Sequence, residues 1–199
     1  MKMKKFKIIE FCTVTDFVAN GSFASLKKNV KYLDDDGYAI LIRFTDYVKN
    51  WKAKFKYVSL KSYKFLKHSS LKPGDLIMSN VGDPGRVFIL PDLGRPTTLG
   101  PNSILIRPNE KIAKNKYLFY YFQSAKGKNQ IKKIITSTAQ SKFNKTAFRG
   151  LDIFLPPLDV QQKIILKLDN TEKLLNKYED AKKIANSLKL SILDEIFND

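Results

Sequence analysis

The chain has 199 residues, which allows one ordinary domain with an accessory element, or two small domains. Its hydrophobic fraction of 43% excludes wholesale disorder, and 36 Lys and Arg against 19 Asp and Glu give a net charge of +17 that indicates a polyanionic partner. One cysteine and one histidine exclude a disulfide framework and most zinc sites. No apolar run reaches about 18 residues, so we expect no membrane partner and a cytoplasmic protein.

Short elements bounded by turns are expected in the first half of the chain. Residues 7–18 are ambiguous between a strand and a helix, whereas residues 38–44 are typical of a buried strand. The further elements, in chain order, are an edge strand or exposed loop at 49–58, a short helix at 59–67, and two strands at 76–80 and 86–90 that form a hairpin.

The next segment combines predicted strands and helices with a long basic stretch. We expect a strand at 103–107, a helix at 115–125 that 128–135 extends or follows, and a last strand at 150–155 ended by Pro156 and Pro157. Between Glu110 and Asp152 there are ten basic residues and no acid. This favours a polyanion-binding segment, although a solvated lysine-rich face would look similar. The aromatic cluster Tyr117, Phe119, Tyr120, Tyr121 and Phe122 is mostly core by its helical spacing, with base stacking as the alternative.

The last segment has a different character. Leu158 to Phe197 contains no Gly and no Pro over 40 residues, which predicts one helix about 60 Å long. An apolar seam with heptad spacing runs along it through Leu174, Tyr178, Ala181, Ala185, Leu188 and Ile192. Residues 157–199 carry seven lysines and eight acids, a balance of −1, so residues 1–156 carry the remaining 29 basic and 11 acidic residues. We therefore expect a mixed α/β domain at 1–156 that binds the polyanion, and a coiled-coil dimerisation helix at 157–199.

No catalytic set is recognisable. A glycine-rich phosphate loop is absent, and the one Pro-Pro pair lacks the amide or carboxylate that a DNA methyltransferase would place before it. Asp34, Asp35 and Asp36 beside Gly37 favour a solvated turn over a metal site, and Asp180-Ala181-Lys182 lies within the predicted helix. We expect no cofactor, no metal and no catalytic residue.

Residues suited to reading DNA are plentiful. Lys and Arg neutralise phosphates, while Asn, Gln and Arg read base edges. Two polar loops stand out, Arg95–Thr98 with Gly100–Asn102, and Ser137–Lys145; each is equally plausible as an inert loop. The polar, loop-placed candidates are Asn80, Arg86, Arg95, Asn102, Gln140, Lys142, Asn144 and Lys145, and the candidate phosphate contacts are Lys128, Lys132 and Lys133.

These segments, in this order, resemble the specificity subunits of type I restriction-modification systems. The resemblance rests on 71–77 (LKPGDLI) with the glycines that follow it, on Gln140 and Phe143-Asn144, and on 153–158 (IFLPPL) followed by Gln161-Gln162 and the long helix. It covers roughly residues 37–199. Gln161 stands where the family usually has an acid, and Phe143-Asn144 where it often has Asn then Ile. A full subunit has two recognition domains and two such helices, so this chain resembles half of one.

The resemblance implies a non-catalytic DNA-recognition subunit. Its front domain would read one half of an interrupted site in double-stranded DNA. Its helix would pair with a second copy, giving a homodimer, or with another half-type specificity chain. Methyltransferase (M) subunits, and in some systems a restriction (R) subunit, would dock on this assembly.

Two alternatives remain at this point. One is a truncated decoy or regulatory fragment that pairs with full specificity subunits. The other is a freestanding metal-dependent nuclease.

Overall fold

The computed structural model describes residues 3–136 and 140–197, so Ser137, Thr138 and Ala139 of the predicted polar loop lie outside the described residues. The chain divides into two compact units, one ending at Leu158 and one beginning at Asp159. The first unit mixes strands and helices and the second is a single long helix, which confirms the predicted α/β class. No helix among the described residues is long and apolar enough to cross a membrane.

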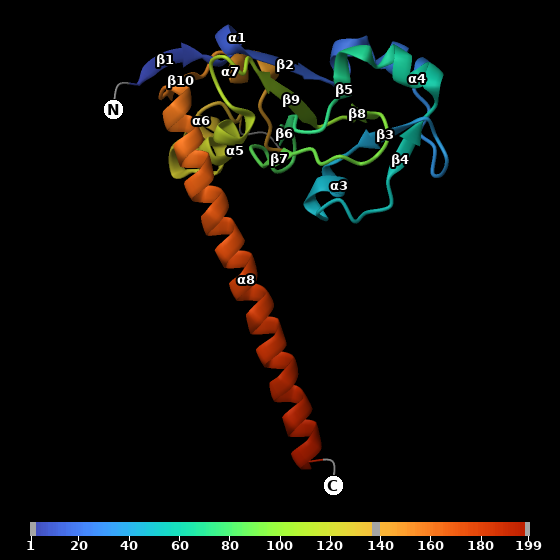
Figure 1. The fold of residues 1–199 in the computed structure, drawn as a ribbon. Helices are drawn as coiled ribbons and strands as arrows, with labels where there is room; N and C mark the ends of the chain where they lie inside the picture. Colours follow the sequence, from blue (N-terminus) through green and yellow to red (C-terminus); the bar gives the residue numbers. More distant parts are fainter. Residues whose placement is uncertain (1–2, 137–139, 198–199) are drawn as a thin grey trace. The chain divides into compact units, whose positions relative to one another are not determined.

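One sheet of the first unit has the order β2-β9-β6-β7 (Figure 1). Its strands are β2 (Cys12–Asp16), β9 (Ser103–Pro108), β6 (Leu76–Ser79) and β7 (Val87–Ile89), all antiparallel to their neighbours. β6 and β7 pair through Leu76 with Ile89 and Met78 with Val87, which confirms the predicted hairpin. All four residues of β6 are buried, because β6 is an inner strand. The chain leaves β6 at Asn80, so the sheet fixes the start of the loop that follows.

A second sheet has the order β4-β3-β8-β5, made of β4 (Lys56–Val58), β3 (Ala39–Ile42), β8 (Thr97–Leu99) and β5 (Ser70–Leu71). β3 and β8 run parallel, and β3 is the buried strand expected within 38–44. The prediction of a polar loop at Arg95–Thr98 is wrong for Thr97 and Thr98, which are buried in β8. Their hydroxyl groups are satisfied by the carbonyl oxygens of Leu71 and Ser69, at 3.4 and 3.2 Å. Hydrogen-bonded threonine fits a buried strand as well as a loop.

The N-terminal segment joins a third, two-stranded sheet. β1 (Lys4–Lys7) pairs antiparallel with β10 (Asp152–Leu155), the predicted last strand. The ambiguous segment 7–18 contains both kinds of element, since the short helix α1 (Ile8–Phe11) precedes β2. The ends of the front domain are therefore joined by backbone hydrogen bonds over about 150 residues of sequence, a pairing that no local pattern could indicate.

The remaining helices of the first unit are short. In chain order they are η1 (Phe17–Asn20), α2 (Phe23–Asn29), α3 (Phe44–Val48), α4 (Leu60–Phe65), η2 (Lys67–Ser69), α5 (Asn115–Gln123), α6 (Ala125–Lys132) and α7 (Lys145–Arg149). Figure 1 shows α5 and α6 at one end of the unit and the β3-containing sheet at the other. In α5 the side chains of Tyr117, Tyr121 and Phe122 are buried, which confirms that the aromatic cluster is mostly core.

A hydrophobic cluster joins the two four-stranded sheets. It contains Ile42, Leu71 and Leu99 from one sheet and Ile77 and Leu105 from the other. A second cluster, with Leu26, Leu41 and Leu66 among its members, packs α2 and the end of α4 on the β3-containing sheet. Burial of these side chains is the main stabilising contribution and makes the two sheets one body.

The second unit is the helix α8 (Leu158–Phe197), the 40-residue helix that the sequence predicts. Every described residue from Asn170 onward is exposed. Between Asn170 and Phe197 its apolar side chains are therefore open to solvent rather than packed on other described parts of this chain.

Candidate nucleic-acid interface

The structure brings together residues that lie about 60 positions apart in the sequence. Segment 140–143 runs antiparallel beside 80–82, with Phe143 N–H donating to the Asn80 carbonyl and Gly82 N–H to the Ser141 carbonyl, both at 3.0 Å. Val81 and Lys142 face each other as a bridge pair. A Cβ atom on Gly82 would lie 3.8 Å from Nε2 of Gln140, so the Gln140 amide sits over this glycine. We call residues 80–82 and 140–143 the paired loops.

Asn102 joins the paired loops from the turn between β8 and β9. The N–H of Asn80 donates to the Asn102 carbonyl oxygen at 3.1 Å. Asn102 has φ of 68°, a left-handed conformation that asparagine tolerates better than most residues. Four predicted DNA contacts, Asn80, Asn102, Gln140 and Lys142, therefore lie in one cluster.

Two more predicted contacts are adjacent but already engaged. Asn144 is the N-cap of α7, and its side-chain oxygen accepts from the Ala147 N–H at 2.8 Å. Lys145 lies in the first turn of α7 rather than in a loop, and its ammonium is 2.7 Å from Asp16 Oδ1. The Arg149 guanidinium donates to the Val14 carbonyl on β2. The contacts of Lys145 and Arg149 fasten α7 to β2, so they hold the segment that carries Gln140 and Lys142.

The two arginines predicted to contact DNA, Arg86 and Arg95, lie next to different sheets. Arg86 follows the turn after β6, 3.4 Å from Asp83, with its guanidinium over the Phe88 ring. Arg95 precedes β8 in the other sheet, and its contacts are with Asp36 and the Tyr57 ring. Both side chains are nearly half exposed, at 45 and 44%. The structure thus places Arg86 on the hairpin of the paired loops and Arg95 outside that cluster.

The three predicted phosphate contacts lie on or just after α6. Lys128, Lys132 and Lys133 are all exposed, and none has an ion-pair partner among residues 3–136 and 140–197. Ile131, on the buried side of α6, would lie 2.9 Å from a Cβ atom on Gly85. Helix α6 therefore packs on the β6–β7 turn and presents unpaired cations beside it.

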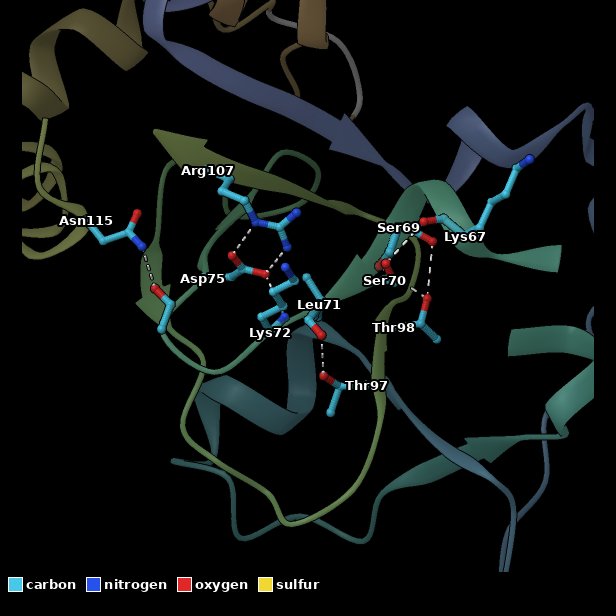
Figure 2. A network of polar contacts seen from close by, with 11 residues as sticks. Lys67, Ser69, Ser70, Leu71, Lys72, Asp75, Thr97, Thr98, Arg107 and Asn115 are labelled. Atoms are coloured by element: carbon cyan, nitrogen blue, oxygen red, sulfur yellow. Dashed lines mark hydrogen bonds and ion pairs between the residues drawn. The ribbon is translucent and has the colours of Figure 1, made fainter. Parts of the chain in front are cut away.

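A polar network holds the chain at the opposite end of β6 (Figure 2). Asp75 is buried, with its carboxylate accepting from the Lys72 N–H and from Arg107 Nε on β9, both at 2.7 Å. The hydrogen bond to Asp75 raises the pKa of the Arg107 guanidinium above its ordinary value. Asn115, at the start of α5, donates to the Gly74 carbonyl at 3.0 Å. These bonds, of which those to the Asp75 carboxylate are charge-assisted, fix the entry to β6 and thereby the position of the loop at its exit.

The three consecutive aspartates form ion pairs, and the single cysteine is buried. Asp34, Asp35 and Asp36 pair with Lys56, Lys54 and Arg95. Burial raises the pKa of the Cys12 thiol to about 12, so it carries almost no nucleophilic thiolate near neutrality. Over the described ranges, 3–136 and 140–197, no group of three His, Cys, Asp or Glu residues is arranged to hold a metal ion.

Reasoning from the sequence missed a second basic surface. Residues 17–33 and 59–74 contain no acid, and they bring α2 and α4 together: the Ser62 hydroxyl donates to the Asn29 carbonyl at 2.8 Å. The exposed lysines on and next to α2 and α4 are Lys27, Lys28, Lys31, Lys61, Lys64 and Lys67. The signal was the same absence of acids as at 111–151, split between two shorter segments. We call this set the α2–α4 lysine surface.

On α8 the predicted seam is exposed. Leu174, Tyr178 and Leu188 are 67, 64 and 61% accessible and Ile192 is 45% accessible. Large apolar side chains exposed in a row along one helix are typical of an interaction surface.

Comparison with known proteins gives a consistent result. Residues 2–187 match the family described as type I restriction modification DNA specificity domain. A curated relative, the putative type I restriction enzyme MjaX specificity subunit of Methanocaldococcus jannaschii, is 31% identical over 130 residues, which are 62% of this chain and 30% of the relative.

Solved structures show the same fold. The HsdS subunit from Thermoanaerobacter tengcongensis aligns with a TM-score of 0.63 at 16% identity, over 90% of this chain and 39% of that one. A chain from a structure of a type I R-M system aligns with a TM-score of 0.65 at 15% identity, over 90% and 40%. This chain thus spans less than half the length of the proteins it matches. Because the family match extends over nearly all of its residues, the chain belongs to the type I restriction modification DNA specificity domain family.

Proposed function

We propose that this chain is the DNA sequence-recognition subunit of a type I restriction-modification system, reading one half of an interrupted target. The observation that carries the proposal is the cluster of Asn80, Asn102, Gln140 and Lys142, flanked by the unpaired lysines of α6. Amides and a cation held by backbone pairing suit base edges, and the lysines of α6 suit the flanking phosphates. The subunit would be non-catalytic and would act in the cytoplasm of a bacterial or archaeal cell.

The second part of the proposal is dimerisation through α8. The side chains of the seam are large at both ends and small in the middle, so the order of their sizes is the same in both directions along the helix. In an antiparallel pair Leu174 would face Ile192, Tyr178 would face Leu188, and Ala181 would face Ala185. Large residues then meet large ones and small meet small, as a two-fold interface between identical chains requires. A second half-type specificity chain with a similar seam is the other partner that fits.

An antiparallel pair would place two recognition units on two half-sites. A helix of 40 residues is about 60 Å long, and 60 Å corresponds to at most about 18 base pairs. Two identical units related by two-fold symmetry would read a palindrome with a gap. Methyltransferase subunits, and a restriction subunit where one is present, would act at the site so chosen.

Solution mass of matched variants tests the dimer. The wild-type chain of 22.9 kDa should give twice that mass in sedimentation equilibrium, 2 × 22.9 = 45.8 kDa. Replacing Leu174 and Leu188 with Glu should give the single-chain mass. The apolar contact along the seam is then lost, and pairing would remove water from two glutamate charges. Leu175→Glu with Leu190→Glu is the control, since these leucines are also about 60% exposed but lie outside the seam. A wild-type monomer, or equal dissociation of both variants, would overturn dimerisation through this seam.

DNA methylation tests the recognition role. Co-expressed with its cognate methyltransferase subunits in a host lacking other such systems, the chain should direct methylation to one interrupted palindromic motif, mapped by sequencing modified bases. Loss of this methylation in the Leu174, Leu188 variant would connect it to the dimer. In a second host that carries a full-length specificity subunit, lower methylation by that subunit when the chain is expressed would indicate the decoy instead. DNA cleavage by the purified chain with Mg²⁺ alone would indicate the nuclease.

A further inference from the structure

A pocket of about 570 Å³ lies between the paired loops and α2. Its wall is mainly apolar, with rings from Phe17, Phe23 and Tyr32 and aliphatic side chains from Leu26 and Val81. Pockets of this size with aromatic walls and a few polar groups are typical sites for planar organic ligands. Contacts to base edges in a groove and to phosphates would not by themselves require such a hollow.

Two amide groups of the pocket come from the paired loops and the turn beside them, and Asp16, Lys27 and Ser103 also line it. Asn80 and Asn102 both line it. The side-chain carbonyl oxygen of Asn80 is inaccessible to solvent and accepts no hydrogen bond from any described residue. An unsatisfied buried acceptor is costly, so a ligand bearing an N–H donor would gain by reaching it after a small movement of the amide. The amide nitrogen is held by a long bond to the Phe143 carbonyl, at 3.3 Å, which leaves room for that movement.

The outer rim of the pocket is aromatic and exposed. Phe23, the first residue of α2, is 82% accessible, and Tyr32 is 49% accessible. Phe23 is fixed in place because Ser22 caps α2, accepting from the Ser25 N–H at 3.3 Å. A solvent-exposed phenylalanine on a capped helix is typical of a residue that makes its contact only when a ligand is bound.

Cationic surfaces flank the pocket on two sides. Lys27 is itself a lining residue and belongs to the α2–α4 lysine surface. On the other side Lys142 is opposite Val81, and residues opposed in an antiparallel pair project to the same face. A polyanion that contacts both Lys27 and Lys142 would therefore pass close to the pocket.

We infer that the pocket receives one unstacked nucleobase of the bound DNA. The inference rests on the proposed function and extends it from contacts in a groove to a site for an extruded base. Aromatic rings stack on any base, and each of the DNA bases has an N–H donor on its Watson–Crick edge that could reach Asn80. Unstacking is costly in an intact duplex and nearly free at an unpaired base. The pocket therefore adds a preference for positions where pairing is weak.

The experiment compares two duplexes of about 20 base pairs that differ by one unpaired central adenine. Binding to the full-length protein is measured by fluorescence anisotropy at low salt. Wild type should bind the duplex with the unpaired adenine about tenfold more tightly than the fully paired one. Phe23→Ala should reduce this ratio to about twofold, and Phe23→Trp should keep it, because it restores an aromatic ring. Leu60→Ala is the control, since Leu60 is an exposed apolar residue of α4 outside the pocket.

The outcomes separate this inference from the function beneath it. Equal affinity of wild type for the two duplexes, or an unchanged ratio in Phe23→Ala, would overturn the nucleobase site and leave DNA recognition standing. Failure to bind either duplex would overturn the proposed DNA recognition itself.

Discussion

The lysines of α6 allow a quantitative prediction about DNA binding. Lys132 and Lys133 are exposed at the end of α6 and lack acidic partners among the described residues. If each neutralises one phosphate, each releases a condensed counterion when DNA binds. Replacing both with Gln should therefore weaken binding to all sequences alike and reduce its dependence on salt.

The size of the effect follows from the number of charges. Each phosphate contact contributes about 0.9 to the slope of log affinity against log salt, so removing two contacts should reduce the slope by about 1.8. Between 50 and 200 mM salt, a fourfold change, the wild type should then lose about 12-fold more affinity than the variant. Loss of cations at a helix C-terminus also removes about 0.3–1 kcal/mol of helix stabilisation for each, so folding is checked by circular dichroism.

Anisotropy titrations of a labelled duplex at several salt concentrations measure the slope. The matched control is Lys182→Gln with Lys183→Gln, an adjacent lysine pair on α8 that changes the net charge by the same amount. The control should retain the wild-type slope, because α8 belongs to the near-neutral segment. Equal slopes for wild type and the α6 variant would remove these lysines from the interface. Equal losses in the two variants would mean that only overall charge matters.

Two further predictions concern the scaffold. Asp75→Ala should lower the free energy of unfolding by about 2 kcal/mol in urea titrations, because it leaves the Lys72 N–H and the partly buried Arg107 unpaired. The loss is smaller than for a fully buried ion pair, because the Arg107 side chain is 34% exposed and water stabilises its charge. A change below about 0.5 kcal/mol would contradict a stabilising role for the network. Burial raises the pKa of the Cys12 thiol to about 12 in the folded protein, whereas an ordinary cysteine in the unfolded chain has a pKa of about 8.5. At pH 8 the folded protein should therefore react with a disulfide reagent at least about 100-fold more slowly than the protein unfolded in urea. The rate in the folded protein should rise about tenfold per pH unit from pH 7 to 10, because the thiolate fraction does so below the pKa; a plateau near pH 9 would show an accessible thiol.

Part of the site could be predicted from residue type and part could not. Asn80, Gln140 and Lys142 were expected to contact DNA because amides and lysines outside regular elements suit that role. That they lie together depends on backbone pairing between segments about 60 residues apart, which leaves no periodic trace in either segment. Asn144 was also expected as a contact, but its side chain caps α7, a role that depends on where the helix begins.

The amino-acid sequence by itself determined the division of this protein into a strongly basic α/β unit and a near-neutral helix. Net charge and an unbroken run of 40 residues without Gly or Pro are properties of composition and local order. It also determined the β6–β7 hairpin, because turn residues and strand lengths act over a few positions. Only the tertiary structure decided that two acid-free segments form one lysine surface and that a pocket opens between that surface and the paired loops. Such features depend on which distant segments pack together, and packing responds to the whole set of buried side chains rather than to any local pattern.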